Sequence, residues 1–118
     1  MPIYKLYTRP TGVTTWTYSG YTLQIAGNSN GVVNVGSRLD PPGTGAWTAV
    51  SGATRSGNGN PNAPANGDDL GLPSTIGTVT NVTGDGTYSS TGDGTHGAGY
   101  YTTQGAAGDE GDWCATAT

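Results

Sequence analysis

The chain has 118 residues, a net charge of −4 and only 10% charged residues, and its aliphatic content is five Leu, three Ile and seven Val. This length fits one domain, but so few aliphatic side chains exclude a large aliphatic core. The acidic balance and four scattered basic residues argue against binding to nucleic acid or to an anionic membrane surface.

Residue usage predicts an all-β fold. Gly occurs 22 times and Thr 20 times. Thr favours strands, and no stretch shows the apolar period of a helix. We expect a small antiparallel sandwich or a barrel-like meander, with long loops or arms rich in Gly, Pro and Asn and no significant helix. Seven Tyr and three Trp are expected to supply much of the core area.

The N-terminal β region, residues 1–54, contains four predicted strands separated by turn signals. Gly20 lies inside the second of them and predicts a bulge or bend. The turn at 27–31 predicts a hairpin between the second and third strands. The four strands are expected at residues 3–9, 13–26, 32–39 and 46–54.

Residues 55–74 form a Gly-, Asn- and Pro-rich segment without periodicity, which predicts a linker or an extended arm. Residues 75–118 are expected to form a β-meander and a C-terminal tail, with strands at 75–82 and 99–105. We expect the three regions to form one domain overall.

The pentapeptide TGDGT occurs twice, at residues 83–87 and 91–95. Asp-Gly is typical of type I′ hairpin turns, so Asp85-Gly86 and Asp93-Gly94 are predicted hairpin tips that enclose a strand at 87–92. A calcium repeat is disfavoured, because two carboxylates are too few for such a site. A nucleotide loop at "GDGTHG" (92–97) is disfavoured, because no helix can follow it.

The chain has few side chains that could act in catalysis or bind a metal ion. A catalytic triad or a zinc site would need His96, the single histidine, and Cys114 could in principle pair with it as a nucleophile. Nothing local joins the two, and a buried structural thiol beside Trp113 is favoured. The acidic runs at 68–69 and 109–112 are interpreted as solvated loops. We therefore expect no enzyme activity, no catalytic residue, no metal site and no cofactor.

The aromatic residues leave two interpretations open. They are either core residues, which we favour because aliphatic side chains are few, or exposed platforms that contact a partner or stack on glycans. The candidates for partner or glycan contact are Trp16, Tyr18, Tyr21, Trp47 and Trp113.

The opening "MPIYKLYTRPTGVTTWTYSGYTLQIAG" begins directly with a strand and lacks the apolar run of a signal peptide, and the meander around TGDGT follows later. With the low charge and the excess of Gly and Thr, this composition resembles the small accessory proteins of tailed-phage virions, namely head decoration (cement) proteins and fibres. The resemblance implies a non-enzymatic homo-oligomer that binds the major capsid protein or other virion subunits and stabilises the head. It implies synthesis in the host cytoplasm and a final location in the virion. A fibre or tail component and a glycan-binding β module are the alternatives.

Overall fold

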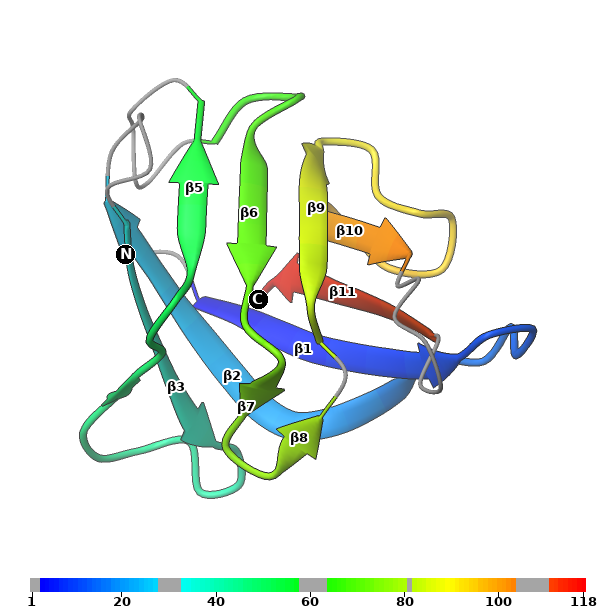
Figure 1. Ribbon diagram of the computed structural model, residues 1–118. Coiled ribbons are helices and arrows are strands. Elements are labelled where there is room, and N and C mark those ends of the chain that lie inside the picture. Colours follow the sequence, from blue (N-terminus) through cyan, green and yellow to red (C-terminus); the bar gives the residue numbers. More distant parts are fainter. Residues whose placement is uncertain (1–2, 28–32, 58–63, 81, 104–110) are drawn as a thin grey trace.

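The structure of the protein is a computed structural model that describes residues 3–27, 33–57, 64–80, 82–103 and 111–118. Within these ranges the chain forms strands and no helix, so the all-β prediction is confirmed. Accordingly, no helix among the described residues is long and apolar enough to cross a membrane. A 9-stranded antiparallel sheet, in the order β4-β3-β2-β1-β11-β10-β9-β6-β5, curls into a half-barrel, and β7 and β8 form a separate 2-stranded sheet (Figure 1).

The strands are numbered in their order along the chain. Their bounds are β1 Ile3–Pro10, β2 Thr17–Gly27, β3 Val33–Leu39, β4 Thr48–Ala49, β5 Thr54–Ser56, β6 Asp69–Leu72, β7 Thr75–Ile76, β8 Val79–Thr80, β9 Gly84–Ser89, β10 Gly99–Thr103 and β11 Gly111–Ala117.

The N-terminal strands match the prediction closely. Between β1 and β2 the register changes from Lys5↔Thr22 to Tyr7↔Tyr18, so three residues of β2 lie opposite Leu6. Gly20 lies at the centre of this bulge with φ +84°, a conformation that glycine adopts without strain. The hairpin of β2 and β3 is also confirmed. The bulge bends β2 and helps the sheet to curl.

The predicted strand at 46–54 is wrong, because it is two short strands on opposite edges of the sheet. Gly52, with φ +87°, turns the chain between β4 and β5. Residues 58–63 of the predicted linker at 55–74 lie outside the described ranges. The prediction is wrong for residues 55–56, which belong to β5, and for residues 69–72, because β6 lies between β5 and β9. Its two leucines, Leu70 and Leu72, are buried at period two, in a run too short to stand out in the sequence.

The C-terminal half differs further from the prediction. The expected strand at 75–82 is a tight hairpin of β7 and β8 around Gly77, which has φ +60°. The strand expected at 99–105 is confirmed as β10 over residues 99–103, and residues 104–105 lie outside the described ranges. The expected tail contains β11, which pairs with both β1 and β10 at the centre of the sheet.

The two copies of TGDGT adopt different structures. Asp85 and Gly86 do not form a hairpin tip, because both lie inside β9, where they pair with Gly71 and Leu70 of β6. The predicted strand at 87–92 is therefore shifted to β9. Asp93 and Gly94 do lie in the connection between β9 and β10, as expected, and Gly94 has φ +91°.

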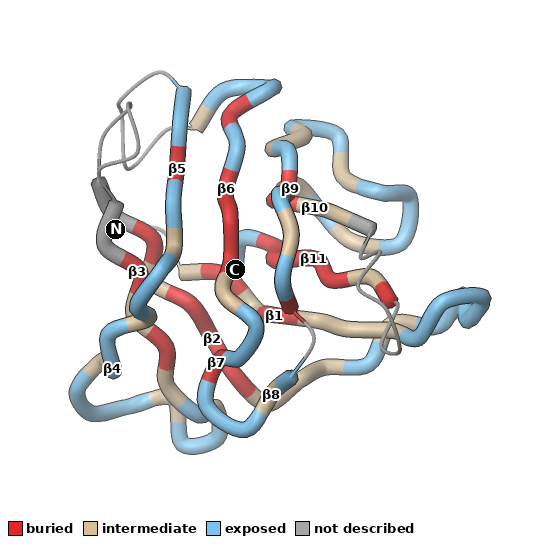
Figure 2. The backbone as a smooth tube through the Cα atoms, in the orientation of Figure 1, coloured by how far each residue is buried: buried red, intermediate tan, exposed pale blue. Residues whose placement is uncertain are grey.

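The concave interior of the half-barrel holds the core, and buried residues run along β2, β6 and β11 (Figure 2). Aromatic rings supply much of its volume, as predicted: Trp113 is fully buried, and Tyr100 packs edge-on against Tyr4 with ring centroids 5.8 Å apart. The buried apolar residues of this core are Tyr4, Leu6, Tyr21, Leu23, Ile25, Val35, Leu70, Leu72, Ile76, Val82, Tyr100, Trp113 and Ala115.

Both acidic runs differ from the expected solvated loops. Asp68 is buried beside the buried Arg55, with Nη2 and Oδ2 3.4 Å apart, whereas Asp69 is exposed. Asp112 lies in β11 and pairs with Arg9 at 2.7 Å. The rest of the second run, 109–110, lies outside the described residues.

Candidate functional site

The candidate site lies on the outer, convex face of the sheet over β1 and β11. Side chains alternate along a strand, so Cys114 points away from its neighbours Trp113 and Ala115, which belong to the core. Across the ladders Cys114 pairs with Tyr7 of β1 and Tyr101 of β10. Cys114 is nevertheless fully buried. The outer face therefore carries a second small packed region, separate from the main core.

The connection between β9 and β10, residues 90–98, brings two more polar groups to Cys114. Ligating atoms of Asp93, His96 and Cys114 all lie within 4.8 Å of one another. Asp93 Oδ1 accepts hydrogen bonds from the backbone N–H of Thr95 at 2.9 Å and of His96 at 2.7 Å. The hydroxyl of Thr95 donates to the same oxygen at 2.9 Å. These bonds make the turn a rigid frame for both side chains.

Aromatic rings hold the imidazole of His96 in place. Its centroid lies 4.3 Å from that of Tyr7 and 5.8 Å from that of Trp16. Tyr7 in turn packs on Tyr18, with centroids 5.4 Å apart. The guanidinium of Arg9 stacks on Trp16 at 4.1 Å. The imidazole is thus fixed by packing on two sides.

The electrostatics of the region differ from those of a reactive thiol site. The pKa of Cys114 is raised to about 12, chiefly by burial and also by the negative charge of Asp93, while Arg9 acts to lower it. Burial also raises the pKa of Asp93, but the hydrogen bonds from Thr95 and His96 outweigh this and leave it below its ordinary value. The thiol is therefore protonated and the carboxylate ionised at neutral pH.

A pocket of about 470 Å³ opens beside this region, with Asp93, Thr95, Trp16 and Arg9 among its lining residues. Cys114 does not line it. Small solutes can reach the carboxylate of Asp93 from this pocket, whereas the thiol is screened from it.

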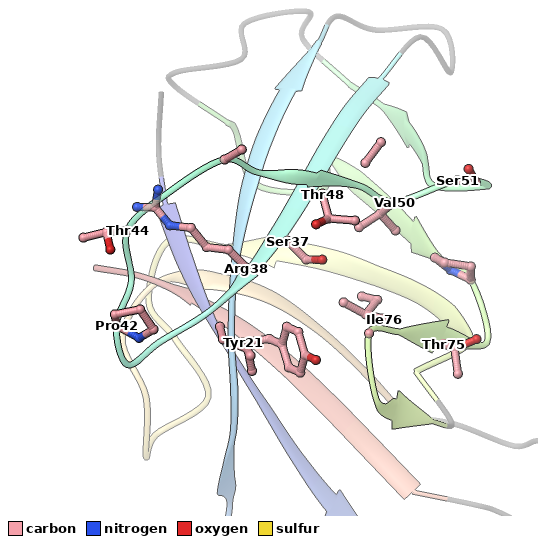
Figure 3. Close-up of a pocket in the computed structure, with 15 residues that line it drawn as sticks. Tyr21, Ser37, Arg38, Pro42, Thr44, Thr48, Val50, Ser51, Thr75 and Ile76 are labelled. Carbon is pink, nitrogen blue, oxygen red and sulfur yellow. The ribbon is translucent and has the colours of Figure 1, made fainter.

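A second and larger hollow lies where the sheet fails to close, and we call it the edge groove. It is bordered on one side by β3, β4 and the loop between them, and on the other by the hairpin of β7 and β8 (Figure 3). Its volume is about 690 Å³. Tyr21 lies beside the hairpin, and its hydroxyl oxygen accepts a hydrogen bond from the backbone N–H of Thr78 at 3.2 Å. Leu39 is 54% exposed on its wall.

The five aromatic residues predicted as partner or glycan contacts do not form one platform. Tyr21 and Trp113 are buried in the core, as the favoured interpretation held. Trp16 and Tyr18 belong to the outer-face region, and Trp47 lies beside β3, where Arg38 stacks on its ring at 3.9 Å. The arginine stacked on each of Trp16 and Trp47 occupies a ring face that a sugar would need.

Sequence reasoning named His96 and Cys114 as a possible pair but did not join Asp93 to them. It also missed Arg9 and Tyr7 of β1. The missing information was the pairing of β1 with β11, which sets Tyr7 opposite Cys114. No local motif encodes this pairing. The one available signal was the alternation in "WCA" (113–115), which places Cys114 on the face opposite Trp113. No protein-family model, curated protein or solved structure matches the chain.

Proposed function

We propose that this chain is a non-enzymatic structural subunit that docks on a larger assembly, of the capsid decoration or cement type, and stabilises a phage head. The observation that carries the docking role is the edge groove. The large sheet ends there in β4, a strand of only two residues with one hydrogen-bonded neighbour. An unclosed edge beside a hollow is a surface on which an extended segment of another subunit adds as a further strand.

The lining of the edge groove suits such a segment. Ile76 and Val50 supply buried or half-buried apolar surface, and Ser37, Thr48 and Thr75 supply hydroxyls for a polar backbone. Leu39 adds an exposed apolar side chain at the rim. Apolar surface together with hydroxyl groups suits strand addition, in which main-chain hydrogen bonds give affinity and side-chain pockets give specificity.

The reactive groups support a role without catalysis. Cys114, the one thiol of the chain, is buried and protonated, and a thiol in that state is a poor nucleophile. His96 Nδ1 lies 3.8 Å from Asp93 Oδ1, which is too far for the hydrogen bond that orients a general base. The pair of half-buried His96 and buried Cys114 is therefore better suited to structure or binding than to acyl transfer.

The proposal that the larger assembly is a phage particle rests on the composition of the chain. Low charge, abundant Gly and Thr and a core that depends on aromatic rings resemble phage accessory proteins. Attachment to a capsid adds buried area and stabilises such a subunit by mass action. A fibre or tail component has the same need for a docking surface, so the position on the particle distinguishes the two roles.

Particle binding tests this proposal. Particles purified from cultures that express the gene are labelled with gold-conjugated antibody against the chain and viewed by electron microscopy. Label distributed over the heads would support the decoration role. Label confined to tails or fibres would support the alternative role of a fibre or tail component. Particles without label would overturn the proposal.

A matched pair of variants tests the edge groove itself. Leu39→Asp places a charge at the groove, and Val13→Asp places the same charge at an exposed apolar side chain that does not line it. We expect Leu39→Asp to weaken binding of fluorescently labelled chain to stripped particles by about tenfold or more, because docking would bury the new charge without a partner, and Val13→Asp to leave it unchanged. Equal binding by both variants would move the docking surface elsewhere.

A further inference from the structure

We infer that Asp93, His96 and Cys114 form a binding site for one divalent transition-metal ion of the Zn²⁺ class. The inference does not depend on the proposed structural role. Carboxylate, imidazole and thiolate are the three side chains that bind Zn²⁺ in proteins, at about 2.0–2.3 Å from the ion. A soft thiolate beside an imidazole selects Zn²⁺ over Mg²⁺ or Ca²⁺, which prefer oxygen ligands alone.

The separations fit an ion-free site of this kind. In a tetrahedral zinc site, ligand atoms lie about 3.5 Å from one another, as the bond lengths require. Here they lie within 4.8 Å. Closing onto an ion needs movements of about 1 Å, which side-chain rotation supplies without a change in strand pairing.

The turn that carries two of the ligands is already organised. Within the described part of the chain, the hydrogen bonds that Thr95 and His96 donate to the Asp93 carboxylate all go to Oδ1, which leaves Oδ2 for a metal. Thr95 Oγ1 lies 2.9 Å from Asp93 Oδ1 and 3.1 Å from His96 Nδ1. The hydroxyl thus links the two ligands and fixes their separation, as the groups around first ligands do in known metal sites.

Charge and access also agree. The cluster has one ionised carboxylate, and metal binding would release the thiol proton of Cys114 to solvent, giving two negative charges for an ion of charge +2. The nearby Arg9 is neutralised by Asp112 at 2.7 Å. The pocket of about 470 Å³ reaches Asp93, the most exposed of the three ligands, so an ion from solvent meets this carboxylate first.

A Cys–His–Asp catalytic arrangement explains the same residues less well. A nucleophile must face the substrate pocket, and neither Cys114 nor His96 lines it. The distance of 3.8 Å between His96 Nδ1 and Asp93 Oδ1 is longer than a hydrogen bond. Convergence on a point between the three side chains is what a metal needs.

Cobalt titration of the chelator-treated full chain tests the site. We expect one Co²⁺ per chain, a thiolate-to-cobalt charge-transfer band and intense visible bands of tetrahedral cobalt, all removed by one equivalent of Zn²⁺. Each of Cys114→Ser, His96→Gln and Asp93→Asn should weaken cobalt binding by about tenfold or more. Loss of a group that only hydrogen-bonds a metal ligand already lowers metal affinity by about that factor, so loss of a ligand itself should cost at least as much.

The repeat supplies a matched control, because Asp85 occupies in the first TGDGT the place of Asp93 in the second. Asp85 lies in β9, so Asp85→Asn should bind cobalt as the unaltered chain does. Asp85 is exposed, and Asp93→Asn keeps an Oδ1 that can accept the hydrogen bonds of the turn, so both variants should leave the fold intact. A thiolate band that survives both Asp93→Asn and His96→Gln would show adventitious binding to the thiol and overturn the site, as would the lack of any band.

Discussion

The buried ion pair of Arg55 and Asp68 gives the sharpest prediction about stability. Arg55 is 2% exposed and Asp68 4% exposed, and Nη2 lies 3.4 Å from Oδ2. Asp68 Oδ2 also accepts a hydrogen bond from the backbone N–H of Ala65 at 2.9 Å. The pair therefore ties the edge strand β5 to the segment that leads into β6. Arg55→Met removes the positive charge, keeps the length of the side chain and leaves the carboxylate buried.

The expected cost follows from this burial. Removing one partner of a buried ion pair costs about 3–5 kcal/mol, because the remaining charge loses its compensation. In a chain of this size 1 kcal/mol corresponds to about 3–5 °C, so Tm should fall by about 10–20 °C. Arg9→Met is the matched control: its pair with Asp112 is shorter, at 2.7 Å, but the two side chains are 28% and 13% exposed. Solvent screening and its stacked ring limit that loss to about 1 kcal/mol.

Urea unfolding followed by tryptophan fluorescence measures both losses. A double variant, Arg55→Met with Asp68→Asn, keeps an oxygen for the N–H of Ala65 and removes both charges. It should be more stable than Arg55→Met alone by about 1–3 kcal/mol, the usual size of coupling within one pair. The reasoning fails if Arg55→Met costs no more than Arg9→Met, or if the losses in the double variant simply add.

Three further predictions concern the strands and their titrating groups. In β9 a Cβ on Gly86 would lie 2.5 Å from a ring atom of the buried tryptophan, so Gly86→Ala should cost about 1–3 kcal/mol in urea unfolding. A Cβ on Gly94 would lie more than 4 Å from any other atom, so Gly94→Ala should cost only about 1 kcal/mol, for its φ of +91°. Equal losses for the two variants would support the original prediction of a hairpin tip at 85–86. Native Cys114 should react with a thiol reagent at least about 100-fold more slowly than the unfolded chain, since burial protects the thiol and keeps it protonated; equal rates would place it at the surface. Burial raises the pKa of Tyr18 and of Tyr101 from 10 to about 12, so the folded state holds more protons in that range, and stability present below pH 10 should fall as pH rises through 12. A constant Tm across this range would contradict it.

The sequence predicted best where local patterns and tertiary pairing agree. Gly20 interrupts an alternating run, and the bulge there adds two residues to β2 between the pairs Tyr7↔Tyr18 and Lys5↔Thr22. The aromatic core was predictable because the chain has few other large apolar side chains. Errors arose where strands are short. β4, β6 and β7 have two to four residues each, which is less than the period-two pattern needs in order to stand out.

The candidate site shows the same limit at the level of chemistry. Its three polar side chains come from a loop and from a strand that pairs with the N-terminal strand, and the sequence does not state which strands are neighbours. β11 pairs with β1 through seven residue pairs, and this register alone sets Tyr7 beside Cys114. A prediction from composition finds one histidine and one cysteine and has no physical ground for bringing them together.

The repeated TGDGT shows why identical local sequence does not fix structure. Asp-Gly predicts a hairpin tip most strongly between alternating apolar residues, and here Thr, Ser and Gly surround it. At the first copy, β6 offers unpaired backbone and two leucines that anchor the core, so pairing through Gly71↔Asp85 extends the sheet and overrides the turn tendency. At the second copy, the carboxylate of Asp93 caps its own turn with two backbone N–H groups instead. One copy of the pentapeptide therefore pairs β9 with β6 in the large sheet, and the other places a carboxylate beside the imidazole and the thiol.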